Sequence, residues 1–164
     1  MIWTILKWVI TPLLLVAVVL ALIGRETFHV EVTIPAPPEE VWAVLMDTSA
    51  YGDWNPVFTK VEGEYNEGAN IRNTVQAPDG QILDIETTVK VLNENRELRQ
   101  TGGMTGLLTF DHQWLLESVE GGTRVTQHEI DQGLYMWFWD SGWIEPSYAK
   151  VSEALRDRIA SINH

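Results

Sequence analysis

The sequence predicts an α+β domain in which a curved antiparallel sheet wraps around one long C-terminal helix, preceded by a transmembrane helix. Three observations lead to this prediction. An apolar run fills residues 1–24, turn residues separate a series of strand-like segments between residues 28 and 132, and the last segment repeats apolar residues at helical spacing. We therefore divide the chain into a transmembrane anchor (or signal-anchor), residues 1–24, and a folded domain, residues 25–164.

The N-terminal run carries one charged residue, Lys7, and is uncharged from Trp8 to Gly24. That length is at the short end for a membrane span, for which about 20 apolar residues are typical. If Lys7 reaches back toward the headgroups, the helix can begin near Ile2 and is long enough. Trp3 and Trp8 then lie where interfacial aromatic residues concentrate. We expect a single-pass membrane localisation on this basis.

A cleaved signal peptide is the alternative interpretation of the same run, with cleavage after Ala21. Lys7 and Arg25 flank the run almost symmetrically, so the distribution of basic residues barely defines the orientation. The short N-terminal tail slightly favours an extracytoplasmic domain.

The composition excludes several classes of function. The chain has 23 acidic and 11 basic residues, a net charge of −12, which argues against nucleic acid as a partner because phosphate binding needs a basic surface. The absence of cysteine excludes disulfides, thiolate catalysis and cysteine-based metal sites. The four histidines lack metal-ligand spacing, so we expect no metal and no cofactor.

The folded domain is predicted to begin with a strand over Phe28–Ile34, where apolar and polar residues alternate. A helix follows, with Pro38 at an early position and the carboxylates of Glu39 and Glu40 in its first turn. The stretch 48–56 is turn-like, because Asn55-Pro56 stops helix continuation.

Six further strands and a final helix complete the prediction. Short turns between the strands favour an antiparallel meander. The predicted strands are Val57–Glu64, Asn70–Gln76, Gln81–Leu92, Arg96–Thr101, Leu107–Val119 and Thr123–Gln132. Pro146 opens the helix, whose apolar face is formed by Tyr148, Val151, Leu155, Ile159 and Ile162.

Several motifs resemble the START-like (SRPBCC) superfamily, in its polyketide cyclase/dehydrase and lipid-transport branch. They are Ile34-Pro35-Ala36-Pro37-Pro38-Glu39-Glu40-Val41-Trp42, then Leu45, Asp47, Tyr51 and Trp54-Asn55-Pro56, with Glu64 and Gly68, Gly121-Gly122-Thr123, and Glu129 and Gly133 further on. The resemblance covers about residues 28 to 162. It implies a helix-grip fold with a deep, largely apolar cavity between the sheet and the C-terminal helix, so that residues 25–164 would be a ligand-binding domain.

What the resemblance implies about function is broad. Members of this superfamily carry lipids, sterols or polyketides, and a minority are cyclases or dehydratases, so the fold does not decide the activity. The family often has histidine where Gln127 stands and an apolar residue where Asp131 stands. These departures weaken any catalytic role carried over to this strand.

Candidate ligand contacts lie on one face of the strand Leu107–Val119. Leu108, Phe110, His112 and Trp114 alternate along it and are expected to line the cavity. His112 is a polar group among aromatic residues, so it is either an acid–base or ligand-binding group or an ordinary core histidine. Trp54 could line the opening of the cavity, or it could form a structural corner with its neighbour Asn55.

The strand Thr123–Gln132 offers two carboxylates whose direction depends on the preceding turn. If Gly121-Gly122 forms a two-residue turn, His112 pairs with Asp131 and Trp114 with Glu129, both carboxylates facing the cavity. An ionised Asp131 would then raise the pKa of His112. A three-residue loop would instead turn both carboxylates to solvent. The catalytic candidates are therefore His112, Asp131 and Glu129, without a commitment to any of them.

Aromatic residues fill the segment 134–139 and recur at Trp143. This segment could form a lid, contact the bilayer interface or belong partly to the core. We include Trp137 and Trp139, together with Leu155 of the final helix, among the expected ligand contacts.

Three functions remain open at this point. The first is a membrane-tethered binding module for a hydrophobic small molecule, such as a lipid, an isoprenoid or a polyketide-like compound. The second is a cyclase- or dehydratase-type enzyme that uses a His/carboxylate pair. The third is a non-catalytic protein whose acidic surface docks a basic partner. The sequence identifies neither protein partners nor the oligomeric state.

Overall fold

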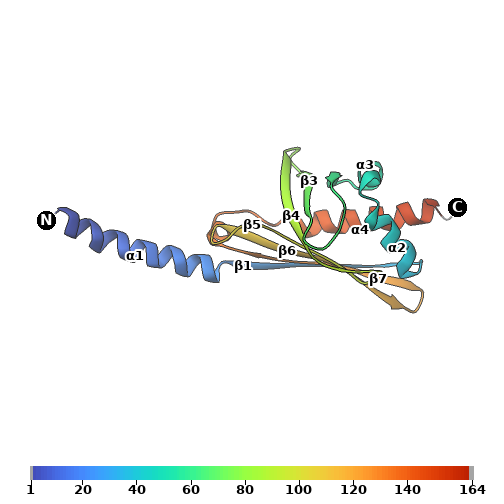
Figure 1. Cartoon of the computed structure of the whole chain (residues 1–164), viewed down its shortest axis with the longest axis horizontal. Helices are drawn as coiled ribbons and strands as arrows, with labels where there is room; N and C mark the ends of the chain where they lie inside the picture. Colours follow the sequence, from blue (N-terminus) through green and yellow to red (C-terminus); the bar gives the residue numbers. More distant parts are fainter. Residues whose placement is uncertain (1, 163–164) are drawn as a thin grey trace.

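The computed structural model describes residues 2–162, with side chains from Trp8 onward, and contains one curled seven-stranded antiparallel sheet (Figure 1). The strand order is β1-β7-β6-β5-β4-β3-β2, so the first and last strands of the chain lie side by side. The strands are β1 (Arg25–Ile34), β2 (Phe58–Glu62), β3 (Asn70–Gln76), β4 (Ile82–Asn93), β5 (Glu97–Met104), β6 (Leu108–Val119) and β7 (Gly122–Gln132). The predicted meander and its sheet are confirmed.

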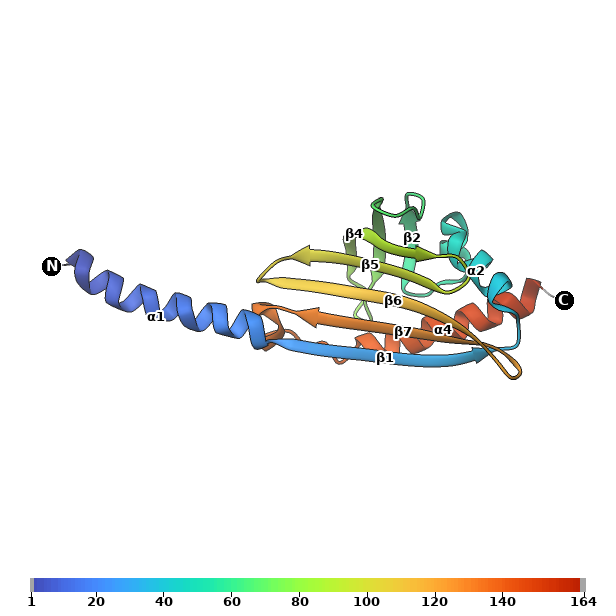
Figure 2. The same ribbon diagram turned by 60° about the horizontal axis from the view of Figure 1, so that its bottom comes forward.

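The helices between and after the strands lie on one side of the sheet (Figure 2). They are α2 (Pro38–Met46), η1 (Thr48–Ala50), α3 (Tyr51–Trp54), η2 (Leu134–Trp137) and the long α4 (Ile144–Ile162), while α1 (Ile2–Ile23) precedes β1. The helix-grip architecture predicted for residues 25–164 is thus present, with the C-terminal helix held against the curled sheet.

The main core lies where α2 and α4 meet the sheet. Val41 and Leu45 of α2 and Leu155 of α4 are completely buried there. Each comes from the apolar face that the helical spacing predicts, and full burial of such a side chain contributes about 1.5–3 kcal/mol. This packing fixes the C-terminal half of α4 against the sheet and leaves its N-terminal half free to form part of a cavity.

Asn55 makes the corner between α3 and β2. Its Oδ1 accepts hydrogen bonds from the backbone N–H groups of Val57, at 3.0 Å, and Phe58, at 2.8 Å. The side chain is buried, and the neighbouring Trp54 ring lies 5.2 Å from the ring of Tyr51. The structural interpretation of Trp54-Asn55-Pro56 therefore applies to Asn55.

The predicted transmembrane anchor is wrong. Within residues 2–162, no helix is both long and apolar enough to cross a membrane. The predicted single-pass membrane localisation is therefore wrong, and so is the prediction that this helix makes the membrane a partner.

Candidate functional site

A cavity of about 500 Å³ lies between the inner face of the sheet and the N-terminal half of α4. Strands β2 to β7 all contribute to its wall, and exposed residues at its rim, among them Gln81 and Tyr135, mark its opening. The wall is mostly apolar and aromatic. Its lining includes Tyr51, Val57, Phe58, Tyr65, Val75, Leu83, Ile85, Leu108, Phe110, Trp114, Trp139, Trp143, Ile144 and Tyr148.

A row of buried polar side chains crosses this apolar wall, and we call it the polar belt. Gln100 of β5, His112 of β6 and Glu129 of β7 are direct cross-strand partners. On β4, Thr87 Oγ1 accepts hydrogen bonds from Gln100 Nε2, at 2.8 Å, and Asn73 Nδ2, at 3.2 Å. The polar belt comprises Asn73, Thr87, Gln100, His112 and Glu129, all of which line the cavity.

Two carboxyl groups, Glu129 and Asp131, form what we call the acid pair at the β7 end of the belt. Both are buried, and both line the cavity because they occupy alternate positions on the inner face of β7. The phenolic O–H of Tyr148, on α4, donates a hydrogen bond of 2.7 Å to Glu129 Oε2. Asp131 Oδ1 is buried without a hydrogen-bond partner among the described residues.

Burial disfavours ionisation of the acid pair. Desolvation, followed by the charge of Asp131, raises the pKa of Glu129 to about 8. Desolvation is also the main reason why the pKa of Asp131 rises to about 7, with the charge of Glu26 acting in the same direction. Near neutral pH the pair therefore holds a proton that ordinary surface carboxylates would have lost.

His112 lies between aromatic rings, stacked on Tyr148 with ring centroids 5.0 Å apart and on Phe58 at 6.4 Å. Its Nε2 has no hydrogen-bond partner in the part of the chain that the structure describes. Desolvation lowers the pKa of His112 to about 4, although interaction with Gln127 opposes this effect. The imidazole is therefore neutral at pH 7, and the predicted rise in its pKa is wrong.

The pairing of β6 with β7 differs from the predicted one by two residues. His112 lies opposite Glu129, Asp131 lies opposite Phe110, and Trp114 lies opposite Gln127. The two-residue turn is formed by Glu120 and Gly121, because Val119 pairs with Gly122. A shift of two keeps every side chain on its predicted face, so both carboxylates still point inward while the predicted His112–Asp131 and Trp114–Glu129 pairs are wrong.

Five of the expected ligand contacts line the cavity: Leu108, Phe110, His112, Trp114 and Trp139. Leu155 does not, because it is completely buried in the core beneath α2. Trp137 is half exposed, and its indole Nε1 donates a hydrogen bond of 3.0 Å to Leu20 O at the end of α1. The aromatic segment 134–139 is thus divided between the cavity rim, the contact with α1 and the exposed Phe138.

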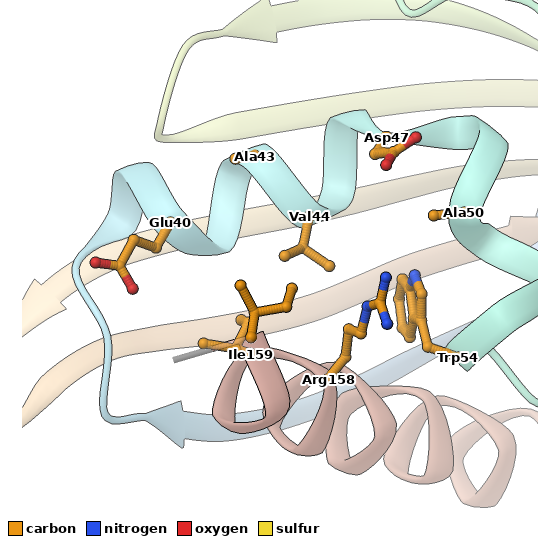
Figure 3. A pocket seen from close by; sticks show the side chains of 9 residues that line it. Glu40, Ala43, Val44, Asp47, Ala50, Trp54, Arg158 and Ile159 are labelled. Atoms are coloured by element: carbon orange, nitrogen blue, oxygen red, sulfur yellow. The ribbon is translucent and has the colours of Figure 1, made fainter. Parts of the chain in front are cut away.

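Trp54 lines a second, smaller hollow of about 270 Å³ between α2 and α4. Figure 3 shows Arg158 beside Trp54, and Val44 of α2 and Ile159 of α4 pointing toward each other. Trp54 therefore lies away from the wall of the main cavity, and we remove it from the residues that define the main site.

The sequence pattern does not reveal Tyr148 as a member of the site. The helical spacing places it only on the apolar face of the final helix, yet its hydroxyl donates a hydrogen bond to Glu129. The signal in the sequence is a tyrosine within an otherwise aliphatic stripe, because a buried tyrosine hydroxyl usually finds a polar partner. The sequence offers no comparable indication that Asn73 and Thr87 belong to the polar belt.

Within the described residues, no group of three or more His, Asp or Glu side chains is arranged to hold a metal ion. The described lining of the main cavity also contains no Lys or Arg. What the arrangement offers is an apolar volume with protonatable carboxyl groups and one free imidazole nitrogen at one end.

Comparison with known proteins identifies the family. A family model described as polyketide cyclase/dehydrase and lipid transport matches residues 25–160, so the chain belongs to this family. The search of curated proteins found no match.

Solved structures share the fold at low sequence identity. The protein TTHA0849 from Thermus thermophilus matches with a TM-score of 0.70 and 18% identity, covering 85% of this chain and 100% of that one. An uncharacterised protein from Rhizobium leguminosarum matches with a TM-score of 0.67 and 17% identity, covering 84% and 95%. The di-domain ARO/CYC protein BexL from the BE-7585A biosynthetic pathway matches with a TM-score of 0.63 and 14% identity, covering 84% and 49%. At these identities the likeness concerns the fold alone.

Proposed function

We propose that this member of the polyketide cyclase/dehydrase and lipid transport family binds an apolar small molecule in the cavity between the sheet and α4. The observation that carries the proposal is the cavity itself: about 500 Å³ with a mostly apolar and aromatic wall. Ligand sites are typically concave and apolar, with a few polar groups that fix orientation. A lipid, an isoprenoid or a polyketide-like compound has suitable chemistry.

The polar belt supports a ligand with a polar group at one end. Asp131 Oδ1 and His112 Nε2 are buried without partners among the described residues, and an unpaired buried polar atom costs about 1–3 kcal/mol. A bound molecule that hydrogen-bonds to these atoms would remove that cost. The aromatic residues line the volume and leave it open, which favours ligand binding over a purely structural, acidic interaction protein.

Native mass spectrometry of the purified full-length protein tests the proposal directly. We expect an additional mass of a small apolar compound that is lost on denaturation. After removal of that compound, an environment-sensitive apolar dye should bind with about micromolar affinity and be displaced by long-chain lipids. Absence of both a bound compound and dye binding would contradict the proposal.

An acid–base enzyme of the cyclase or dehydratase type is the second candidate. It is favoured by the presence of a protonated carboxyl, a phenol and a neutral imidazole at one end of the cavity. The two candidates predict different behaviour of Glu129→Gln. This substitution would abolish turnover of a bound polyketide-like compound in an enzyme, whereas a binding protein would convert no such compound in either form.

A further inference from the structure

The charged side chains that line the cavity are acidic. The acid pair contributes two carboxyl groups to the wall, and the described lining has no Lys or Arg. On β1, Glu26 lies opposite Asp131, and its carboxylate accepts a hydrogen bond from the Ser141 hydroxyl. Every ionisable group that faces the acid pair from a neighbouring described element is therefore acidic or neutral: Glu26 on β1, His112 on β6 and Tyr148 on α4.

The cations on nearby strands do not compensate for the acid pair. Arg99 of β5 makes two hydrogen bonds to Asp111 of β6, at 2.7 and 2.5 Å. Asp111 alternates with the inward-facing Phe110 and His112, so this ion pair lies on the outer face of the sheet. His112 cannot supply positive charge either, because its pKa is about 4.

Two buried hydrogen-bonding atoms at this end of the cavity have no partner among the described residues. Asp131 is 2% exposed, and its Oδ1 accepts no hydrogen bond from any described residue. His112 also lines this cavity, and its buried Nε2 has no hydrogen-bond partner among the described residues. The rings of Tyr148 and Phe58 stack on His112 in the same wall.

We propose that the cavity selects an apolar ligand that carries a protonated amine, and that the ammonium group binds at the acid pair, with Asp131 Oδ1 accepting one of its hydrogen bonds. This inference rests on the proposed function, because it names the chemical class of the ligand. An ammonium supplies both the missing positive charge and the missing donor. A fatty-acid carboxylate or a phosphate would add a further negative charge beside Glu129 and Asp131 and is disfavoured.

Proton release should accompany amine binding. The free acid pair holds protons at slightly acidic pH, whereas an ammonium stabilises its ionised form. Binding therefore drives a proton from a carboxyl group to the solvent, and the ligand keeps its own. Because His112 stays neutral between pH 5 and 8, it adds nothing to this pH dependence.

The test compares three ten-carbon probes on the full-length protein: decylamine, decan-1-ol and decanoate. Dissociation constants are measured by isothermal titration calorimetry, which also reports proton release when buffers of different ionisation enthalpy are used. At pH 8 we expect decylamine to bind at least tenfold more tightly than decan-1-ol, and decanoate to bind more weakly than either. At pH 5 the advantage of the amine should fall below threefold, while the affinity for the alcohol stays constant.

Isosteric variants locate the effect. Glu129→Gln and Asp131→Asn should each reduce the advantage of decylamine over decan-1-ol below threefold. Glu117→Gln is the matched control, because Glu117 pairs with Arg124 at the far end of β6, and it should change nothing. An amine advantage that persists in both acid-pair variants would mean attraction to the acidic surface and would overturn the inference.

The outcomes separate the two proposals. If decan-1-ol binds and decylamine binds no better at pH 8, the cavity binds apolar ligands but the amine inference is wrong. If none of the three probes binds, the proposed function fails and the inference fails with it.

Discussion

Glu129 lines the cavity, and burial of its carboxyl group costs free energy of folding. A carboxyl group buried in an aromatic cavity loses its hydration, and one hydrogen bond from Tyr148 at 2.7 Å only partly replaces it. The pKa of Glu129 consequently rises to about 8. Because the folded state binds this proton more tightly than the unfolded state, the acid pair favours folding at low pH and opposes it as the pH increases.

The first prediction follows from the raised pKa of Glu129. The contribution of the acid pair to stability should be fully present below about pH 4 and should be lost as the pH rises toward 8. The free energy of unfolding of the original protein, measured by urea titration, should decrease between pH 5 and pH 8. In Glu129→Gln this decrease should be smaller by at least ~1.4 kcal/mol. Glu117→Gln, on the outer face, should follow the original curve. Parallel curves for Glu129→Gln and the original protein would contradict the assignment.

The contribution of His112 to stability has the opposite pH dependence. Its pKa, about 4, lies below the ordinary value of 6.5, since burial disfavours the imidazolium. Its contribution to stability is therefore present above pH 6.5 and is lost as the pH falls toward 4. Nitrogen-15 NMR of the imidazole should find it neutral at about pH 5.5. A titration above the ordinary value would restore the ion pair with a carboxylate that the sequence suggested.

At the scale of elements, the alternation of apolar residues was sufficient to predict the strands and their inner faces. The pairing of β6 with β7 was harder, because Gly121 and Gly122 look like two equivalent turn residues. The structure gives them different roles. Gly121 has a φ of 89° and lies in the turn, whereas Gly122 begins β7, where a Cβ atom would lie 2.0 Å from the carbonyl oxygen of Ile34. That close approach is a tertiary contact, which the local pattern cannot reveal.

The two glycines should therefore respond differently to alanine. Both have positive φ values, so both substitutions cost backbone strain, on the order of 1 kcal/mol. Gly122→Ala must also displace the backbone of Ile34, the last residue of β1. We expect Gly122→Ala to lower the free energy of unfolding by at least ~1 kcal/mol more than Gly121→Ala. Equal losses in urea titrations would argue for the turn originally predicted at Gly121-Gly122.

At the scale of the whole molecule, the sequence was sufficient for the helix-grip architecture and misleading about the N-terminal segment. The expected span assumed that Lys7 reaches out of the bilayer, but none of the described helices is both long and apolar enough to cross a membrane. The candidate site was predicted in part. Periodicity identified the inward faces of β6 and β7. Gln100 and Thr87 join the site through the pairing of β4, β5 and β6, and Tyr148 joins it through the packing of α4 against the sheet.

The last prediction concerns the cavity as a property of the whole fold. A ligand that binds only the folded protein stabilises it by about 2.7 kcal/mol at a concentration of 100 times its dissociation constant. For a chain of this size, that corresponds to a Tm increase of roughly 5–10 °C. Decan-1-ol should produce this increase, measured by differential scanning calorimetry, because an uncharged apolar probe needs only the volume of the cavity.

Two neighbouring residues on β4 provide the matched pair for this experiment. Leu83 lines the cavity, whereas Ile82 is 57% exposed on the opposite face of the strand. Leu83→Trp should fill part of the volume and reduce the Tm increase caused by decan-1-ol by at least half. Ile82→Trp adds the same indole outside the cavity and should leave the increase intact. An equal response of the two variants would mean that the probe stabilises the protein from a surface other than the cavity.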